Sequence, residues 1–299
     1  LLGSKGAFLA QMATDGYAVP PGATMTTEMC NDYFASEHKT HFLDTLWDMT
    51  LEPYMTKVVA ELGHVTAFSC RSGGFYSMPG MMDTILNIGI NRKTLNDFKS
   101  YLGERTALDS YRRGIQMFGA TARGMDPAVF EEVLHSIRVK QGCITDGDLS
   151  VGSLEEICEA FEEMYRAHTS EPEFPAMREQ ILQSIAAVFD SWNSERAIYY
   201  REINGYPSDA GTGCTLQAMV FGNAQGFSGS GVAFSDSPNT GEDDVYGDFL
   251  ENAQGEDVVA GIRDPISVHE LPVVYLDQIA ETLYALRAKA KDMVEIEFT

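Results

Sequence analysis

The sequence has 299 residues, which is enough for a large core and for two or three subdomains, and its 44% hydrophobic and 22% charged residues are ordinary for a soluble globular protein. A formal net charge of −23 argues against proteins that attract nucleic acid or anionic lipid, and no apolar run is long enough to span a membrane. The chain begins without Met and without a signal-peptide pattern, so we expect a piece of a longer protein.

Residues 1–91 mix short apolar runs with Gly and Pro. Apolar spacing predicts a helix from Lys5 to Asp15, and Pro20-Pro21 forces an extended segment after it. A short β-like run from Val65 to Cys70 then leads directly into the segment RSGGFYSMPG. We therefore expect a helix, an extended segment and a strand ahead of this first Gly-rich segment.

Residues 92–200 carry helical periodicity. Asp126-Pro127 predicts an N-cap followed by Pro at the first helical position, and Ser153 with Glu156 predicts a capping box. The break EPEFP ends that unit, and a last helix is predicted from about Ile181 to Trp192. The apolar stripes of these helices indicate core rather than chemistry.

Residues 213–299 are rich in short β-like runs separated by Gly, Asn and Ser turns. One helix is predicted to start near Gln254 and another to run from about Val273 to Lys291. The alternating run VEIEFT predicts a strand with Glu295 and Glu297 on the same face. Such a pair can hold Mg²⁺ when a nucleotide supplies the other oxygens, and the alternative is a solvent-facing strand edge.

Three Gly-rich segments, RSGGFYSMPGMMDT, GNAQGFSGSGVAF and NAQGEDVV, could contact a polyphosphate. The first places an Arg beside a backbone that can direct N–H groups inward, and the second resembles a mobile hairpin tip that could close over phosphates. None matches the P-loop or the dinucleotide-binding pattern, and each alone is also consistent with an ordinary turn. None of the six histidines lies in a setting typical of a phosphate carrier.

The five cysteines are scattered and form no C-x-x-C pair, which argues against a disulfide framework and against a zinc site. We therefore expect a reducing, intracellular compartment, the cytoplasm, while the missing start of the chain leaves an organelle open. The acidic surplus is interpreted as a solvated surface.

Taken in order, these segments resemble the N-terminal ATP/AMP-binding domain of pyruvate phosphate dikinase, over nearly the whole chain. The matching motifs are LLGSKGAFLAQM, VPPGATMTTEMC, RSGGFYSMPGMMDTILNIG, SWNSERAIYYREINGYP, LQAMVFGN, SGSGVAFSDSPNTGE and NAQGEDVVAGIRDP. SMPGMMDTILN resembles this dikinase and not its water-dikinase relatives such as phosphoenolpyruvate synthase. Against the family, the chain is expected to be truncated at both ends.

The resemblance implies an α+β chain with an ATP-grasp fold and a helical insertion. Residues 1–91 with 176–212 would form the first subdomain, 92–175 the insertion, and 213–299 the second subdomain with its C-terminal strand incomplete. A cleft is expected between the two subdomains, as the one positive patch on an acidic protein.

The resemblance also implies a phosphotransferase with paired acceptors, which binds ATP with Mg²⁺ and passes phosphoryl groups to a histidine on another domain. The whole enzyme interconverts ATP, phosphate and pyruvate with AMP, pyrophosphate and phosphoenolpyruvate. The histidine domain and the pyruvate-binding barrel are absent here, so we expect the fragment alone to be inactive.

Site residues follow from the resemblance one at a time. The cations that contact or transfer phosphate would be Lys5, Arg71 and Arg113. Besides Lys5 and Arg71, the nucleotide would contact Gly73, Gly74, Ser77, Gly80, Asp83, Thr84, Gln217, Met219, Val220, Glu256 and Asp257. Gln217 to Val220 match the hinge strand beside the adenine. The metal ligands would be Glu297 and Glu295.

The chain departs from the family pattern at several positions. Ser4 stands where the family has Gly, Asp236 where it has an Arg, and Glu295 where it has Asp. The following family strand, with a Gln and an Arg that face the nucleotide, is absent. The loss of the loop Arg and the acidic charge favour a second interpretation, a degenerate nucleotide-sensing or interaction module without catalysis. The first interpretation is favoured by the joint retention of Lys5, Arg71, Glu256 and Glu297.

Overall fold

A computed structural model describes residues 1–224, 226–261 and 263–299. Gln225, in the expected mobile hairpin tip, and Ile262 lie outside the described residues. The described residues combine helices with two antiparallel four-stranded sheets, which confirms the α+β class. Contacts divide the chain into two compact units, Leu1–Met219 and Val220–Thr299.

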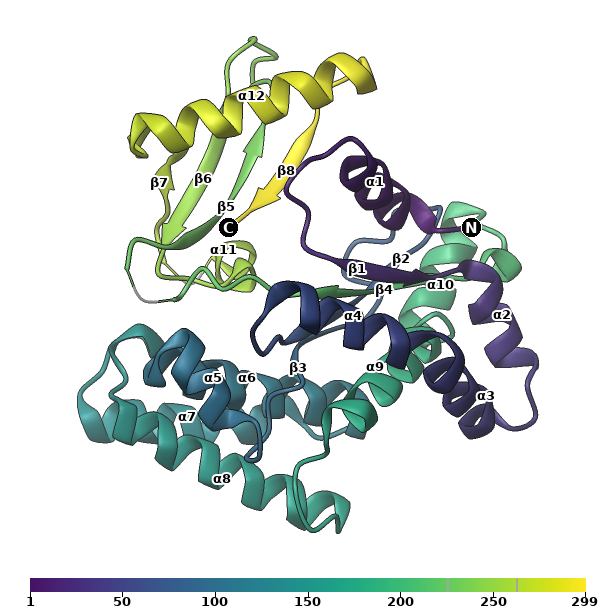
Figure 1. Ribbon diagram of the computed structural model, residues 1–299, viewed down its shortest axis with the longest axis vertical. Helices are drawn as coiled ribbons and strands as arrows, with labels where there is room; N and C mark the ends of the chain where they lie inside the picture. Colours follow the sequence, from purple (N-terminus) through teal and green to yellow (C-terminus); the bar gives the residue numbers. More distant parts are fainter. Residues whose placement is uncertain (225, 262) are drawn as a thin grey trace. The chain divides into compact units, whose positions relative to one another are not determined.

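The first unit contains the sheet β1-β4-β2-β3 (Figure 1). Its strands are β1 (Gly22–Met25), β2 (Phe68–Gly73), β3 (Thr84–Ile88) and β4 (Gly213–Ala218). Its helices are α1 (Gly3–Thr14), α2 (Thr27–Ala35), α3 (Lys39–Leu46), α4 (Glu52–Leu62), α5 (Leu95–Leu102), α6 (Glu104–Arg123), α7 (Pro127–Gln141), α8 (Val151–Thr169), α9 (Met177–Ser191) and α10 (Glu195–Asn204). A π-helical turn covers Trp47–Leu51, and 3₁₀ turns cover Asp146–Asp148 and Ser208–Ala210.

Strand β4 is central in this sheet, because it pairs antiparallel with β1 on one side and with β2 on the other. All of its residues are buried, as expected for a strand with a partner on both edges. The sequence patterns group residues 213–299 in the second subdomain, whereas the compact units divide after Met219. The difference arises because the partners of β4 lie about 150–200 residues earlier in the chain, beyond the reach of local patterns. The predicted subdomain division itself stays a prediction.

The predicted helical stretch is present as α5 to α10. Helix α6 packs against α5, α7 and α8, and it also contacts β3. As predicted, Asp126 caps α7, since its carboxylate accepts the backbone N–H of Ala128 at 3.0 Å. The predicted capping box of Ser153 and Glu156 is wrong. The cap of α8 is Ser150, whose extended backbone lets its hydroxyl accept the N–H of Ser153 at 3.1 Å.

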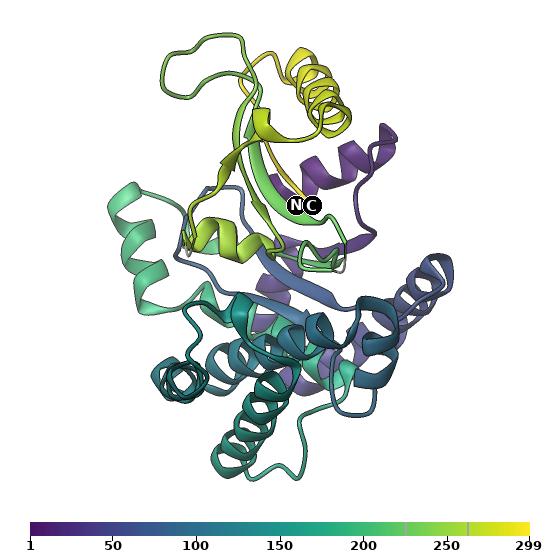
Figure 2. The same ribbon diagram turned by 90° about the vertical axis from the view of Figure 1, so that its left-hand side faces the viewer.

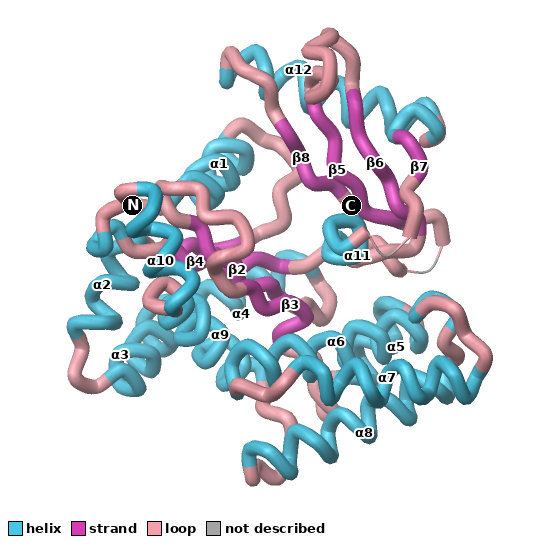
Figure 3. Tube along the Cα trace, turned by 180° about the vertical axis from the view of Figure 1, so that it is seen from behind, coloured by secondary structure: helices cyan, strands magenta, loops and turns pink. Residues whose placement is uncertain are grey.

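The second unit contains the sheet β7-β6-β5-β8. Its elements are β5 (Gly229–Phe234), β6 (Tyr246–Glu251), α11 (Gly255–Ala260), β7 (Ile266–Ser267), a 3₁₀ turn (Val268–Glu270), α12 (Val273–Ala290) and β8 (Glu295–Phe298). Helix α12 lies on one face of the sheet: it passes behind the strands in Figure 3 and lies to one side of them in Figure 2. Its buried Leu283 joins Ala233 and Phe249 in the core of this unit. The strand predicted from VEIEFT is confirmed as β8.

None of the described helices combines the length and the hydropathy that crossing a membrane would require.

A buried ion cluster fastens α6 to the turn before α8. The carboxylate of Asp109 accepts Arg112 Nε at 2.9 Å and Arg113 Nε at 3.1 Å. Arg112 also reaches Asp146 at 2.7 Å, and Arg138 reaches the same carboxylate at 3.0 Å. Burial alone would raise the pKa of Asp109, but Arg112 and Arg113 outweigh it and lower that pKa from 3.8 to about 2. The cluster therefore stabilises the fold only while Asp109 is ionised.

We predict that Asp109→Asn lowers the free energy of unfolding by about 3 kcal/mol at neutral pH, because two buried guanidinium groups lose their shared carboxylate. Since the pKa of Asp109 is lower in the folded chain, its ionised form stabilises the fold above pH 3.8, and this contribution is lost as the pH falls through about 2. Urea unfolding of both proteins from neutral pH down to about pH 2 tests this.

The control is Glu132→Gln, an exposed carboxylate on α7, which should change stability little. A stability difference between wild type and Asp109→Asn that stays constant down to pH 2 would contradict the assigned ionisation.

Candidate functional site

One face of the first sheet is polar although its side chains are mostly buried. Alternation places Cys70 and Leu216 on the face that packs against α9, and Arg71, Thr215 and Gln217 on the other. Thr215 and Gln217 are only 3% and 4% exposed. Buried polar side chains need partners, so such a face is stable only if hydrogen bonds within the protein or to a ligand satisfy it.

Arg71 lies at the centre of this face. It stands opposite Thr215 on β4 and opposite Thr84 on β3, and Thr215 stands opposite Thr24 on β1. The two hydroxyl oxygens of Thr24 and Thr215 are 3.0 Å apart. Arg71 Nη2 donates to Gln217 Oε1 at 2.7 Å. The structure thus brings three of the predicted nucleotide residues, Arg71, Thr84 and Gln217, onto neighbouring positions of one sheet.

The start of α1 packs directly on the end of β2. Gly3 adopts φ of +68°, and a Cβ there would lie 1.7 Å from the carbonyl oxygen of Gly73. Ser4 donates its backbone N–H to the Gly74 carbonyl at 3.1 Å and its hydroxyl to the same oxygen at 3.2 Å. A Cβ on Gly73 would lie 3.3 Å from Lys5 Cβ. Lys5 is therefore placed beside Gly73 and Gly74, two residues along β2 from Arg71.

The N-terminus of α1 adds positive electrostatic potential to this region. The helix has 12 residues, no acidic residue in its first turn, and no side-chain cap from Leu2 among the described contacts. Backbone N–H groups at a helix start attract anions, and the exposed Lys5 lies within the same turn. The arrangement of Lys5, Arg71 and this helix end can bind a phosphate group.

The segment that follows β2 is anchored by its methionines. Met78 is buried against Trp192 and Ala197, and Met81 and Met82 pack on the same cluster. The methionines of SMPGMMDT are therefore structural. Gly80 adopts φ of +71°, a turn conformation that favours glycine, and Ser77 is exposed.

Asp83 pairs with a residue of α10 and not with Arg71 or its neighbours on the sheet. Its carboxylate forms an ion pair with Arg196 of α10, and its backbone N–H donates to Ser191 Oγ at 3.2 Å. It lines a cavity of about 330 Å³ together with Thr121 and Asp190. The structure thus places Asp83 against α6, α9 and α10.

Three further predicted residues lie outside the four strands of the first sheet. Arg113 belongs to the buried cluster with Asp109, and its side chain is 12% exposed. Met219 donates its backbone N–H to Ala67 O at 2.9 Å, and its sulfur accepts the N–H of Asn87 at 3.1 Å. Val220, the first residue of the second unit, is 55% exposed.

The remaining predicted residues are carboxylates of the second unit. Glu295 and Glu297 are exposed on one face of β8, opposite Phe234 and Val232, while Ile296 and Phe298 pack towards α12. This confirms the predicted alternation. The sequence analysis missed Asp248, which also stands opposite Val232 and so shares this face with Glu297. The alternation in YGDFL could have indicated it.

The acidic pair in α11 has different surroundings. Asp257 is 7% exposed, and its carboxylate accepts the backbone N–H of Gln254 at 3.2 Å, which caps the helix. Glu256 occupies the first turn and is half-buried. Asp257 thus has a structural role that the sequence patterns did not predict.

Among the described residues, no group of three or more His, Cys, Asp and Glu side chains could hold a metal ion. Two carboxylates on one strand face fit Mg²⁺ when substrate phosphates complete its coordination, so the donor set of Glu295 and Glu297 suits a metal bound with nucleotide.

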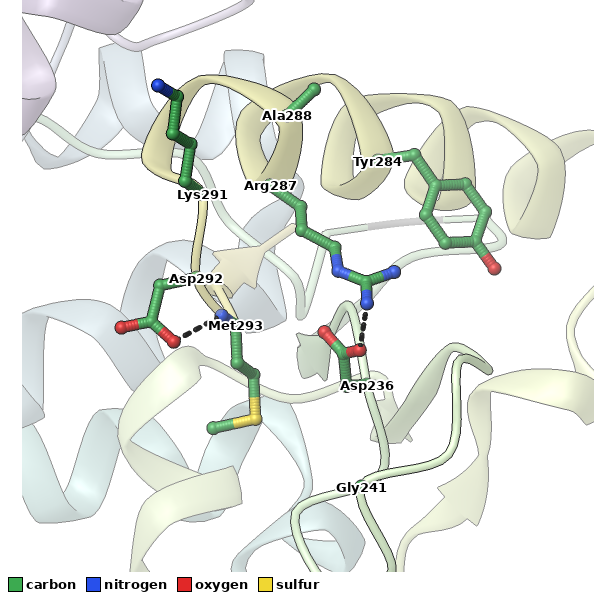
Figure 4. Close-up of a pocket in the computed structure, with 8 residues that line it drawn as sticks. All are labelled: Asp236, Gly241, Tyr284, Arg287, Ala288, Lys291, Asp292 and Met293. Atoms are coloured by element: carbon green, nitrogen blue, oxygen red, sulfur yellow. Dashed lines mark hydrogen bonds and ion pairs between the residues drawn. The ribbon is translucent and has the colours of Figure 1, made fainter.

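Asp236, which stands where the family pattern has an Arg, forms an ion pair with α12 (Figure 4). Asp236 is 7% exposed and accepts Arg287 Nη2 of α12 at 2.6 Å. Arg287 Nη1 also reaches Asp243 at 2.6 Å. Together with Tyr284 and Lys291, Asp236 and Arg287 line a cavity of about 750 Å³. The acidic loop is thus fastened to the C-terminal half of α12.

Comparison with known proteins gives consistent results. Residues 37–271 match the family described as pyruvate phosphate dikinase, AMP/ATP-binding domain. Over its whole length the chain is 43% identical to the chloroplastic pyruvate, phosphate dikinase of Mesembryanthemum crystallinum and 42% identical to pyruvate, phosphate dikinase 1 of Arabidopsis thaliana. It is 41% identical to pyruvate, phosphate dikinase 2 of Zea mays.

The aligned regions cover 32%, 32% and 35% of these relatives, so the chain spans about a third of their length. The chain belongs to the pyruvate phosphate dikinase family and corresponds to its AMP/ATP-binding domain.

Proposed function

We propose that this chain is the ATP-binding part of a dikinase and has an ATP-grasp fold. It would bind MgATP and pass phosphoryl groups to a histidine on a domain outside this chain. The observation that carries the proposal is the placement of Lys5 and Arg71 beside Gly73 and Gly74 at the N-terminus of α1. Two units, each with an antiparallel four-stranded sheet, support the fold assignment.

The triphosphate would be held by the cations of the first unit. The Lys5 ammonium, the Arg71 guanidinium and the first turn of α1 would supply the donors to phosphate oxygens, apart from the Ser4 N–H, which donates to Gly74 O. Lys and Arg charges also neutralise the negative charge that develops during phosphoryl transfer. Because the chain carries a net charge of −23, such a local group of cations is needed to admit a polyanion.

Mg²⁺ would be held by Glu297, with Glu295 as a second ligand. When bound, the ion would neutralise part of the charge of the phosphate oxygens. Glu295 replaces the shorter Asp of the family pattern, so we assign it the smaller contribution. The remaining predicted nucleotide contacts, apart from Gln217, are part of this same proposal.

In the whole enzyme the partners would be phosphate, a phosphohistidine domain, and a pyruvate- or phosphoenolpyruvate-binding barrel. The relatives are about three times as long as this chain, which leaves room for such domains. The overall reaction would convert ATP, phosphate and pyruvate to AMP, pyrophosphate and phosphoenolpyruvate.

A second candidate is a nucleotide-sensing or interaction module without catalysis. It is favoured by Asp236, which replaces a family Arg and is fastened to Arg287 rather than left available. Adding a separately expressed phosphohistidine domain from a relative distinguishes the two. Phosphohistidine formation from ATP supports the dikinase, whereas ATP binding without transfer supports the module.

We predict that Lys5→Met and Arg71→Met each weaken ATP binding about 10- to 100-fold, because each removes a charge-assisted hydrogen bond to phosphate. Isothermal titration calorimetry with ATP measures the change. The control is Lys57→Met, an exposed residue of α4 paired with Glu61, which should leave the affinity unchanged. Equal affinities for all four proteins would remove Lys5 and Arg71 from the site.

We predict that Glu297→Gln removes most of the gain in ATP affinity that Mg²⁺ confers, because the metal loses a charged ligand, and that Glu295→Gln removes less of it. Calorimetry with ATP, with and without Mg²⁺, separates the metal effect from nucleotide binding. The control is Glu281→Gln, an exposed carboxylate of α12. If Glu297→Gln retains the full Mg²⁺ effect, Glu297 is not the metal ligand.

A further inference from the structure

The side chain of Gln217 connects Arg71 to the segment before β1. It is 4% exposed, its Oε1 accepts Arg71 Nη2 at 2.7 Å, and its Nε2 donates to the carbonyl oxygen of Pro20 at 3.0 Å. A carbonyl oxygen can only accept and a guanidinium can only donate, so these two partners determine the orientation of the amide. Both ends of the Gln217 amide are therefore engaged by the protein.

The pairing of β2 with β4 fixes the relative positions of Arg71 and Gln217. Arg71 stands opposite Thr215 on β4, and Gln217 is two residues further along β4 on the same face. The backbone of Gln217 is fixed as well, because β4 pairs with β1 and β2 on its two edges and the next residue, Ala218, donates its N–H to Pro21 O at 2.8 Å. A rigid strand thus presents the amide to the guanidinium.

We propose that Gln217 is a positioning residue that fixes the guanidinium of Arg71 for the phosphate end of the nucleotide, and that it does not itself recognise the base. This inference rests on the proposed function, since it takes Arg71 as a phosphate ligand. It differs from the expectation that Gln217 contacts the adenine as part of the hinge strand.

The chemistry of an amide suits this role. An Arg side chain has many rotamers, and a partner that orders it before binding reduces the conformational entropy that is lost when the ligand binds. The neutral carbonyl oxygen of Gln217 orders the guanidinium without adding negative charge near the phosphate. A carboxylate at the same position would compete with the phosphate for Arg71.

The experiment uses the 299-residue chain and the variants Gln217→Met and Gln217→Glu. The matched control is Ser69→Ala, which removes a hydroxyl directly opposite Gln217 with the same 4% exposure. Affinities are measured for two probes, tripolyphosphate and adenosine, which represent the two ends of the nucleotide. Gln217→Met should weaken tripolyphosphate about tenfold and leave adenosine unchanged. Gln217→Glu should weaken tripolyphosphate more, and Ser69→Ala should change neither.

Repeating the Gln217 substitution in the Arg71→Met variant distinguishes positioning of Arg71 from a general structural effect. In Arg71→Met, the further change Gln217→Met should no longer affect tripolyphosphate, because the residue that it positions is gone. A tenfold loss in both backgrounds would overturn the proposal, and so would a parallel loss of adenosine affinity in Gln217→Met.

A readout without any nucleotide distinguishes failure of this inference from failure of the proposed function. Phenylglyoxal modifies guanidinium groups, and mass spectrometry reports its rate at Arg71. The rate should rise several-fold in Gln217→Met and stay unchanged in Ser69→Ala. An unchanged rate in Gln217→Met would show that Gln217 does not hold Arg71. If the wild type binds neither tripolyphosphate nor adenosine, the proposed function fails while the modification rates still decide on the contact.

Discussion

The antiparallel pairing of β4 between β1 and β2 is the constraint on which the first unit depends. It brings the residues before β1 next to Gln217 and places Thr215 opposite Arg71. Because alternation separates the two faces of β4, the same pairing buries Cys70 and Leu216 against α9 and leaves the polar side chains on the other face. A shift of one residue in this register would exchange the two faces and remove both the core and the candidate site together. Stability and function therefore depend on the same hydrogen bonds.

Charge is distributed unevenly over this acidic chain. Many of its few basic residues are committed to ion pairs within the fold, among them the Arg112 and Arg113 pairs with Asp109 and the Arg287 pair with Asp236. Arg112 also connects α6 to the turn at Asp146, and Arg287 connects α12 to the loop at Asp236, so these pairs stabilise the fold. Lys5 lies at the start of a helix, and Arg71 lies on the polar face of a sheet, two residues from Gly73. The position of a cation, more than the total charge, decides whether it can bind a phosphate.

Local patterns in the sequence predicted α7 with its Asp126 cap, the terminal strand β8 and the common face of Glu295 and Glu297, because each depends on neighbours within a few residues. They failed where the partner is distant. Pairing of β4 with β1 and β2, the contact from Gln217 to Pro20 and the ion pair of Asp236 all join residues far apart in the chain. The predicted cap of α8 was wrong for another reason. Ser150 and Ser153 are both residue types that suit a helix start, and only the backbone conformation decides between them. Site residues came from the resemblance to the family, and their roles remain proposals.

The departures from the family pattern are accommodated by the fold. A side chain is tolerated at Ser4, where the hydroxyl donates to Gly74 O, whereas one residue earlier, at Gly3, a Cβ would collide with the carbonyl of Gly73. Ser4 therefore replaces the family's Gly at a position where a side chain fits without a clash. Asp236 would be an unfavourable buried carboxylate by itself, but Arg287 reaches it at 2.6 Å from α12. Both new side chains therefore have a hydrogen-bond or ion-pair partner within the protein. Each departure costs the fold little stability, because neither new polar group is left unsatisfied.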